Sequence, residues 1–425
     1  MVIVKIKNIK IKVNNFVKHP IIAGSAVLVV GSMAANVVNL IYQVGMGKIL
    51  EPADYGILLS LYSILYILSI VPTSSSVSIV KFISSAKNEK ERSGIYHSVK
   101  KLVFRVATVG TLFVVLFSPF IAKFLNINDV FSVVLTAGVF FFLLTTLVNQ
   151  SSLQGILKFM GVVLPNFVSA FAKLILGVIF IFLGLSVRGA MLAVVIGAGF
   201  AYLLSVKMID GHFQKESKTN LNLDKFIKYS GPVLLQAFAF TSLFTLDVIL
   251  VKHFFSPYEA GIYATVSTLG KIVYFAAAPV ASVMFPHISS RYAKGEKYYE
   301  LLFGSIGLTF LISLVVVGCY FLFPNLIINI LYRSKYIAAA PLLFLMGLFI
   351  AFLTMSNLLV NFFLSIDLPR VVILPFIVAV LQIISIWFFH NSLSQVIMIS
   401  TIETAIMCVI LFGILGRKWL KIYYH

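Results

Sequence analysis

Four ionisable residues stand inside long apolar stretches of this 425-residue chain, and their charges could do chemistry there. They are two cations, Lys173 and Lys271, and two acids, Asp247 and Glu403. A charge within membrane hydrocarbon is costly, so such residues usually mark a substrate or ion pathway. The lysines are expected to bind an anionic group such as a phosphate, as point charges. The acids are expected to bind a coupling cation, Na⁺ or H⁺, or to pair with a nearby lysine for structural reasons.

Two apolar stretches also carry polar side chains on one helical face. The positions i, i+4, i+7 and i+11 are occupied by Ser32, Asn36, Asn39 and Gln43, and again by Tyr62, Tyr66, Ser69 and Thr73. A polar stripe on a spanning helix faces water or other helices and avoids lipid. The stripes therefore predict either a substrate-binding wall or hydrogen bonds between helices. The binding interpretation assigns substrate contacts to Asn36, Asn39, Gln43, Tyr62 and Tyr66, beside the two lysines.

The sequence holds no pattern typical of catalysis or of metal binding. Its two cysteines, Cys319 and Cys408, each lie inside an apolar stretch, and no CxxC pair occurs. No glycine-rich phosphate loop, Walker sequence or nucleophile motif is present. The sequence therefore predicts no catalytic residue, no metal site and no cofactor, apart from a coupling ion.

Composition determines the class of protein. Hydrophobic residues make up 60% of the chain, charged residues 11%, and the mean hydropathy is +1.04. Soluble domains contain about 25% charged residues, so this chain lacks the polar residues needed to cover a water-exposed surface. The apolar stretches are continuous, whereas the strands of a β-barrel alternate. The composition therefore predicts an all-α polytopic membrane protein.

The chain length indicates about twelve spanning helices. A helix that crosses a membrane needs about 20 apolar residues, and each connection adds a few more. The expected spans are 20–45, 53–80, 102–122, 129–150, 161–183, 188–209, 230–252, 258–285, 301–323, 337–360, 370–389 and 393–415.

The basic residues predict the orientation of these spans. The formal net charge is +19, which would suggest nucleic-acid binding in a soluble protein. Here 24 Lys and Arg residues fall in the termini and alternate loops on one side, and six fall on the other. This asymmetry predicts that both termini are cytoplasmic. The lysines are then explained by topology and anionic lipids, without nucleic acid. The expected location is the cell membrane.

An internal repeat divides the chain. Residues 50–57 read LEPADYGI and residues 255–262 read FSPYEAGI, at an offset of 205 that also aligns Tyr66 with Lys271. In each copy the proline sets a turn, the acid is expected to cap the following helix, and the glycine permits close approach. The repeat predicts two parallel six-helix lobes around a central cavity. The expected parts are a basic cytoplasmic tail (1–19), an N-terminal lobe (20–209), a cytoplasmic linker (210–229), a C-terminal lobe (230–415) and a second cytoplasmic tail (416–425).

Residues 39–65 resemble the opening of polysaccharide biosynthesis membrane proteins. The resemblance is carried by a Leu–x–Pro–x–(Asp/Glu)–(Tyr/Phe)–Gly core, here Leu50, Pro52, Asp54, Tyr55 and Gly56. That family consists of oligosaccharide-lipid flippases. Its superfamily, the multidrug/oligosaccharidyl-lipid/polysaccharide exporters, also includes multidrug and toxin extrusion antiporters and lipid II flippases. The resemblance implies a fold of two six-helix bundles that face each other in a V.

The resemblance and the buried charges together predict a flippase. Its substrate would be an oligosaccharide linked to a polyprenyl phosphate or pyrophosphate, moved across the cytoplasmic membrane by alternating access for surface polysaccharide or glycan assembly. Lys173 from one lobe and Lys271 from the other would hold the phosphate, while the lipid tail stays in the bilayer. The partners implied are membrane lipids, the lipid-linked oligosaccharide and glycan assembly enzymes.

Three alternatives remain open from the sequence. A multidrug or cation antiporter of the same superfamily would require acids and aromatic residues in the cavity, which Asp247, Glu403 and the tyrosine stripe allow. A polytopic glycosyltransferase or polymerase would require catalytic acids on a substantial external loop, and Asp129 and Glu259 are isolated near loop edges. A peptidoglycan-precursor flippase often carries two further helices, for which this length leaves no room.

Overall fold

A computed structural model describes residues 20–214 and 223–423, and every regular element in these ranges is a helix. The elements are α2 (Pro20–Ile49), α3 (Pro52–Leu68), α4 (Ile70–Ser84), α5 (Glu89–Phe124), α6 (Val130–Gly155), α7 (Met160–Phe182), α8 (Ser186–Ile209), α9 (Leu223–Phe254), α10 (Pro257–Ala293), α11 (Tyr299–Leu322), α12 (Pro324–Tyr332), η1 (Ser334–Ala339), α13 (Ala340–Ser365), η2 (Pro369–Val372), α14 (Ile373–Phe388) and α15 (Leu393–Tyr423). The predicted tail 1–19 and residues 215–222 of the predicted linker lie outside the described residues.

The number of long apolar helices agrees with the prediction. In the described part of the chain, eleven helical segments are long and apolar enough to cross a membrane. Helix α2, with 30 residues, adds a helix of similar length where the first span was expected. The prediction of an all-α polytopic protein with about twelve spans is therefore confirmed.

Several predicted boundaries differ from the observed ones. The second span divides at Ser69 into α3 and α4, because Pro72 has no N–H for the carbonyl four residues earlier. Helix α5 begins at Glu89, ahead of the predicted start at 102, where Asn88 accepts a hydrogen bond from the Glu91 N–H. Helix α9 already begins at Leu223, inside the predicted linker, and α15 continues through most of the predicted tail.

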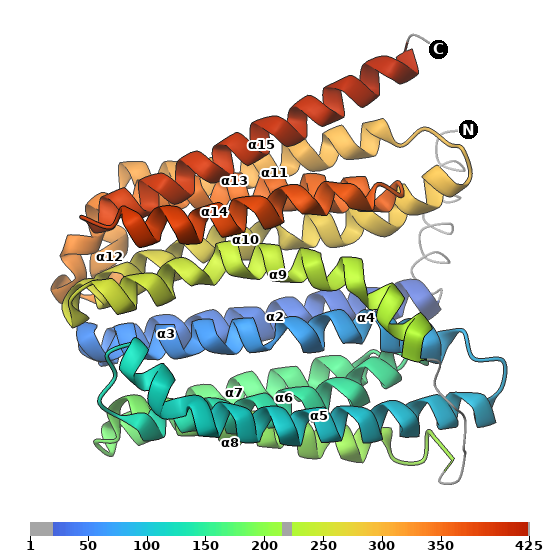
Figure 1. Cartoon of the computed structure of the whole chain (residues 1–425), viewed down its shortest axis with the longest axis horizontal. Helices are drawn as coiled ribbons and strands as arrows, with labels where there is room; N and C mark the ends of the chain where they lie inside the picture. Colours follow the sequence, from blue (N-terminus) through green and yellow to red (C-terminus); the bar gives the residue numbers. More distant parts are fainter. Residues whose placement is uncertain (1–19, 215–222, 424–425) are drawn as a thin grey trace, which may run out of the picture.

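The helices form two groups that follow chain order. Figure 1 shows α2–α8 (blue to green) in one half of the molecule and α9–α15 (yellow-green to red) in the other. The two groups meet where α3 and α4 pack against α9 and α10. Helix α2 begins and α15 ends at the same end of the bundle, on the right of Figure 1. An even number of spans produces this arrangement.

The two copies of the repeat motif touch each other. A Cβ atom on Gly56 would lie 2.8 Å from the backbone nitrogen of Gly261, and one on Gly261 would lie 1.9 Å from the carbonyl oxygen of Pro52. Tyr66 and Lys271, which are also equivalent in the repeat, meet as well, with 5.5 Å between the ammonium and the ring centroid. Equivalent residues therefore face each other across the α3–α10 contact, as at a two-fold interface.

The roles expected for the motif residues hold in part. The glycines do permit close approach. Glu259 caps α10 together with Ser256, each side chain bonding the other residue's backbone N–H. The same expectation for Asp54 is wrong, since that carboxylate accepts a 2.5 Å hydrogen bond from Ser186 at the start of α8. The acid in the first copy of the motif therefore links two helices instead of capping the start of one.

The α3–α10 contact predicts that Gly261→Ala destabilises the protein. The added methyl group has no room beside Pro52, and overpacking of this kind costs about 1–3 kcal/mol. Gly304→Ala in α11 is the matched control, because open space surrounds its Cβ position and alanine favours a helix over glycine by about 1 kcal/mol. Thermal unfolding midpoints in mild detergent should fall for Gly261→Ala and hold or rise for Gly304→Ala. Equal effects would contradict the close contact.

Candidate functional site

A central cavity of about 340 Å³ lies between the two groups of helices. Its wall includes six of the seven residues expected to bind substrate: Asn36, Asn39, Gln43, Tyr62, Tyr66 and Lys173. Helices α2, α3 and α7 supply these side chains, and α10 adds Thr268 and Phe275. Three of the four residues in each polar stripe therefore face one space, and Ser32 and Thr73 do not line it. Among the described residues of this wall, Lys173 carries the charge and no carboxylate is present.

Lys173 is held in the wall by an amide and two aromatic rings. Its ammonium donates a 2.6 Å hydrogen bond to Oδ1 of Asn39. It also lies 4.7 Å from the ring centroid of Tyr42 and 5.5 Å from that of Tyr62. Aromatic faces attract cations, most strongly where water is excluded, and Lys173 is only 9% exposed. Gly197 lets α8 approach, since a Cβ atom there would lie 3.3 Å from Cβ of Lys173.

Lys271 lies behind this wall. It is 2% exposed and does not line the cavity. Its ammonium lies 4.7 Å from the ring centroid of Phe244 and 5.5 Å from that of Tyr66. Tyr66 therefore has one contact with Lys271 and another with the cavity. The structure brings Lys173 to the cavity directly and Lys271 only through Tyr66.

The two acids lie in separate surroundings. Asp247 in α9 is 1% exposed, accepts a 2.7 Å hydrogen bond from the Tyr263 hydroxyl, and interacts electrostatically with Lys271 without forming an ion pair among the described residues. Glu403 in α15 accepts a 2.7 Å hydrogen bond from Ser385 in α14. Each carboxylate keeps one buried oxygen with no hydrogen-bond partner in the described chain. They share no partner, so they do not form one cation site.

Two further cavities continue from the central one. A cavity of about 440 Å³ between α2 and α10 shares Asn36, Leu40 and Phe275 with it. The wall of this second cavity is mostly apolar, and its Met33 and Val37 are 46% and 55% exposed, so it faces outward. A third cavity, of about 870 Å³, shares Ala278 and Ser282 with the second. The three spaces therefore adjoin in series.

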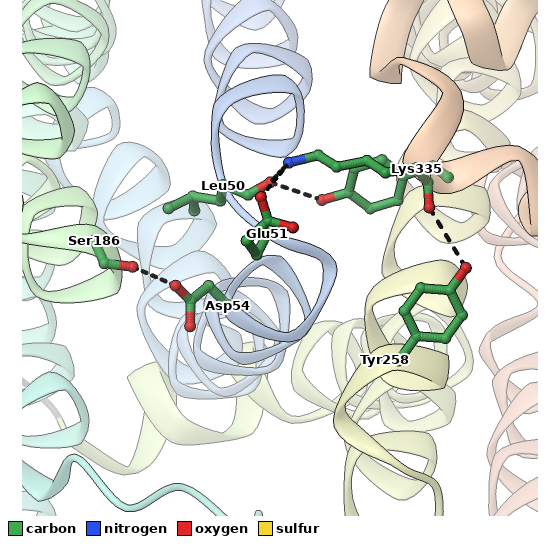
Figure 2. Close-up of polar contacts among 7 residues, drawn as sticks. Leu50, Glu51, Asp54, Ser186, Tyr258 and Lys335 are labelled. Carbon is green, nitrogen blue, oxygen red and sulfur yellow. Dashed lines mark hydrogen bonds and ion pairs between the residues drawn. The ribbon is translucent and has the colours of Figure 1, made fainter.

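One end of the bundle is closed by contacts between the two groups. Figure 2 shows Lys335 of η1 beside the turn between α2 and α3, where its ammonium donates 2.5 Å to the carbonyl of Leu50 and pairs at 3.2 Å with Glu51. The Tyr336 hydroxyl donates to the same carbonyl at 3.2 Å. Asn361, which stands four residues before the end of α13, lies toward the other end. We call the end at Glu51, where α3 and α10 begin, the closed end.

Three buried tyrosines fill the core of the closed end. The Tyr55 hydroxyl shares hydrogen bonds with Thr268 at 2.9 Å and with the Tyr332 hydroxyl at 3.2 Å, and its ring meets Tyr336 edge to face. All three rings are fully buried. The contribution of Lys335, Tyr332 and Tyr336 was missed in the sequence, where they stand in a loop region with no distinguishing pattern. The closed end therefore depends on contacts of high sequence separation.

Comparison with known proteins identifies relatives in sequence. The family profile described as "Polysaccharide biosynthesis protein" matches residues 21–293. Two uncharacterized membrane proteins of Methanocaldococcus jannaschii are also similar. One is 29% identical over 192 residues, which are 42% of this chain and 45% of that protein. The other is 28% identical over 304 residues, which are 63% and 57%. The chain thus spans about half the length of these curated relatives.

Solved structures share the fold. The lipid II flippase MurJ in an inward closed conformation has a TM-score of 0.76 at 16% identity, over 92% of this chain and 87% of that chain. A multidrug resistance MATE family transporter of the MOP superfamily has a TM-score of 0.71 at 16% identity when inward-facing, over 91% and 94%. An outward-facing one scores 0.59 at 15% identity, over 95% and 94%. The fold is therefore that of MATE and MurJ.

The closed end predicts a graded response to substitution. Lys335→Met removes both the ion pair and the bond to the Leu50 carbonyl, whereas Glu51→Gln removes only an exposed ion pair, which contributes about 0–1 kcal/mol. Spin labels at Phe182 and Leu326, both exposed at this end, would report its opening in a variant without the native cysteines. We expect Lys335→Met to add a population with a longer distance between the two spin labels, and Glu51→Gln to change the distance distribution little. A larger effect of Glu51→Gln would contradict this order.

Proposed function

The chain belongs to the polysaccharide biosynthesis protein family, and on that premise we propose that it flips a lipid-linked oligosaccharide across the cell membrane. The substrate carries a phosphate or pyrophosphate between a polyprenyl tail and its sugars. The fold shared with MATE and MurJ is a membrane transporter fold of the MOP superfamily.

The buried charge of Lys173 is the observation that carries the proposal. A lysine in a cavity wall that holds no carboxylate has an unneutralised charge, and an anionic substrate would supply the missing counter-charge. A phosphate or pyrophosphate has the required sign. Asn36, Asn39 and Gln43 would offer hydrogen bonds beside it. Lys271 would add to the positive potential from behind Tyr66 rather than touch the phosphate.

The apolar cavity between α2 and α10 suits the lipid tail. Its lining is dominated by side chains such as Leu28, Met33 and Val37, and it faces outward. A polyprenyl chain could leave the protein there and stay in the bilayer while the polar headgroup crosses inside. This division matches the chemistry of a lipid-linked sugar, whose two ends require different solvents.

Alternating access would operate by opening the closed end. The positive-inside asymmetry would put that end on the outer side and both termini in the cytoplasm. The contacts of Lys335 and Tyr336 with Leu50 at the closed end, and the cavity toward the opposite end, support an inward-open state. Separation of α3 from α10 at Gly56 and Gly261 would then expose the cavity to the outside, as lobes rock about a central site.

A multidrug antiporter is the second candidate, and the MATE-like fold favours it. A cationic drug would be attracted by carboxylates in the cavity. The wall of the central cavity instead presents Lys173, and Asp247 is covered by Tyr263 and Lys271. The electrostatics therefore favour an anionic substrate. A glycosyltransferase or polymerase has no support from a fold shared with transporters.

The proposal predicts that Lys173 controls flipping. In vesicles with a fluorescent polyprenyl-diphosphate sugar, Lys173→Ala should slow flipping by about tenfold or more, because losing about 1.4 kcal/mol of stabilisation changes a rate tenfold. Lys173→Arg keeps the charge and should retain more activity. Lys207→Ala, an exposed lysine at the end of α8, is the control. Unchanged flipping in both Lys173→Ala and Lys271→Ala would remove the phosphate role.

We also propose that Asp247 couples transport to Na⁺ or H⁺. A cation bound at its free oxygen would weaken the attraction between Asp247 and Lys271, and so alter the contact with Tyr66 across the interface. An imposed Na⁺ or pH gradient should change the flipping rate of the wild type, and Asp247→Asn should abolish that response. Glu403→Gln tests the second acid, and a retained response would leave coupling to Asp247. A wild type insensitive to both gradients would exclude coupling.

A further inference from the structure

A third cavity, described above, carries polar side chains without charge. It measures about 870 Å³ and lies between the two groups of helices, toward the end opposite the closed end. Most of its wall comes from α9, α10, α11 and α13, and the first half of the chain adds Val77 and Gln154. Its hydrogen-bonding side chains are Gln154, Gln236, Tyr274, Ser282, Thr309, Thr354, Asn357 and Asn361. No Lys, Arg, Asp or Glu lines it in the described part of the chain.

Three carboxamides form the polar centre of this cavity. Asn357 and Asn361 stand one turn apart on α13, and the Asn361 amide donates 2.7 Å to Oδ1 of Asn357. Gln236 on α9 donates to Oδ1 of Asn361 at 3.4 Å. A carboxamide has two donor hydrogens and an acceptor oxygen. The Asn357 amide nitrogen and the Gln236 carbonyl oxygen have no hydrogen-bond partner among the described residues, so both are free for a ligand.

Two neighbours add to the binding character of the cavity. Thr309 is 1% exposed and its hydroxyl has no hydrogen-bond partner in the described chain, although buried polar groups normally have one. Tyr274 presents an aromatic ring that packs against Phe244, with 5.0 Å between ring centroids. Amides, hydroxyls and an aromatic face are groups that bind the hydroxyls and the apolar face of a sugar ring.

We propose that this amide cavity, lined by Gln236, Asn357 and Asn361, selects the sugar headgroup and accepts neutral sugars in preference to acidic ones. The inference rests on the proposed function and adds the class of sugar that the substrate carries, which is recognised in a cavity other than the one that holds Lys173. A uronic acid would lose its hydration here without gaining a cation, which is unfavourable. A volume of about 870 Å³ lies within the range of about 300–1,000 Å³ that is typical of small-molecule sites. The amide cavity adjoins the cavity between α2 and α10, which adjoins the central cavity with Lys173. The sugar and the phosphate are therefore recognised by different groups.

Binding of four defined probes tests the selection. The purified full-length protein in mild detergent is titrated with one polyprenyl diphosphate in four forms: without sugar, and carrying N-acetylglucosamine, galactose or glucuronic acid. The wild type should bind at least one neutral-sugar form about tenfold more tightly than the sugar-free form, which corresponds to about 1.4 kcal/mol of binding free energy. It should bind the glucuronic acid form no more tightly than the sugar-free one.

Matched variants locate the preference. The double variant Gln236→Leu, Asn357→Leu should reduce the neutral-sugar preference to about onefold while its affinity for the sugar-free diphosphate stays unchanged. Gln236→Leu alone, which removes only the 3.4 Å bond, provides a milder test if the double variant does not fold. Gln150→Leu is the control, because it removes the same kind of amide pair, Gln150 to Asn166 at 2.8 Å, and neither residue lines any of the three cavities.

The outcomes separate this inference from the proposed function. A preference for neutral sugars that survives in both amide variants overturns the inference alone, as does a wild type that binds all four forms equally. A wild type that binds none of the four forms overturns the proposed function and the inference with it. Loss of the preference in the amide variants, with Gln150→Leu unchanged, supports both.

Discussion

The close contact between Gly56 and Gly261 is the constraint on which the arrangement of the two groups of helices depends. Only the absence of both side chains lets the starts of α3 and α10 meet backbone to backbone. That approach brings Tyr55 to Thr268 and, farther along both helices, Tyr66 to Lys271. Toward the other end of the bundle, the space between the two groups of helices stays unfilled. One contact between equivalent residues therefore closes one end and shapes the cavity.

Two lysine side chains are held away from water without a contacting carboxylate. Neither central lysine forms an ion pair among the described residues. Lys173 has an amide oxygen and two tyrosine rings, while Lys271 has two aromatic rings and the nearby charge of Asp247. These partners attract an ammonium less strongly than a contacting carboxylate would. Both lysines consequently retain attraction for an anion, and Tyr66, which contacts Lys271, lines the same cavity as Lys173.

The three cavities differ in the chemistry of their walls. The central one offers a cation and amides, the one between α2 and α10 offers apolar surface, and the amide cavity offers neutral hydrogen-bonding groups. An amphipathic molecule with a phosphate, a lipid and a sugar has one part suited to each. A small lipophilic cation would be repelled by the charge of Lys173. This correspondence connects the family of the chain with the physical character of its interior.

The sequence by itself determined the class, the helix number and the two repeat motifs, because hydrocarbon solvent imposes about 20 apolar residues per span and close helices require glycine. It also indicated that Asn36 and Asn39 share one helical face, because helical spacing is local. It could have indicated Asn357 and Asn361 by the same spacing. Only the tertiary structure decided that Lys271 stands behind Tyr66, that Lys335 closes the end at Leu50, and that Gln236 meets Asn361. Those partners are far apart along the chain, and which side chains meet depends on how the helices pack.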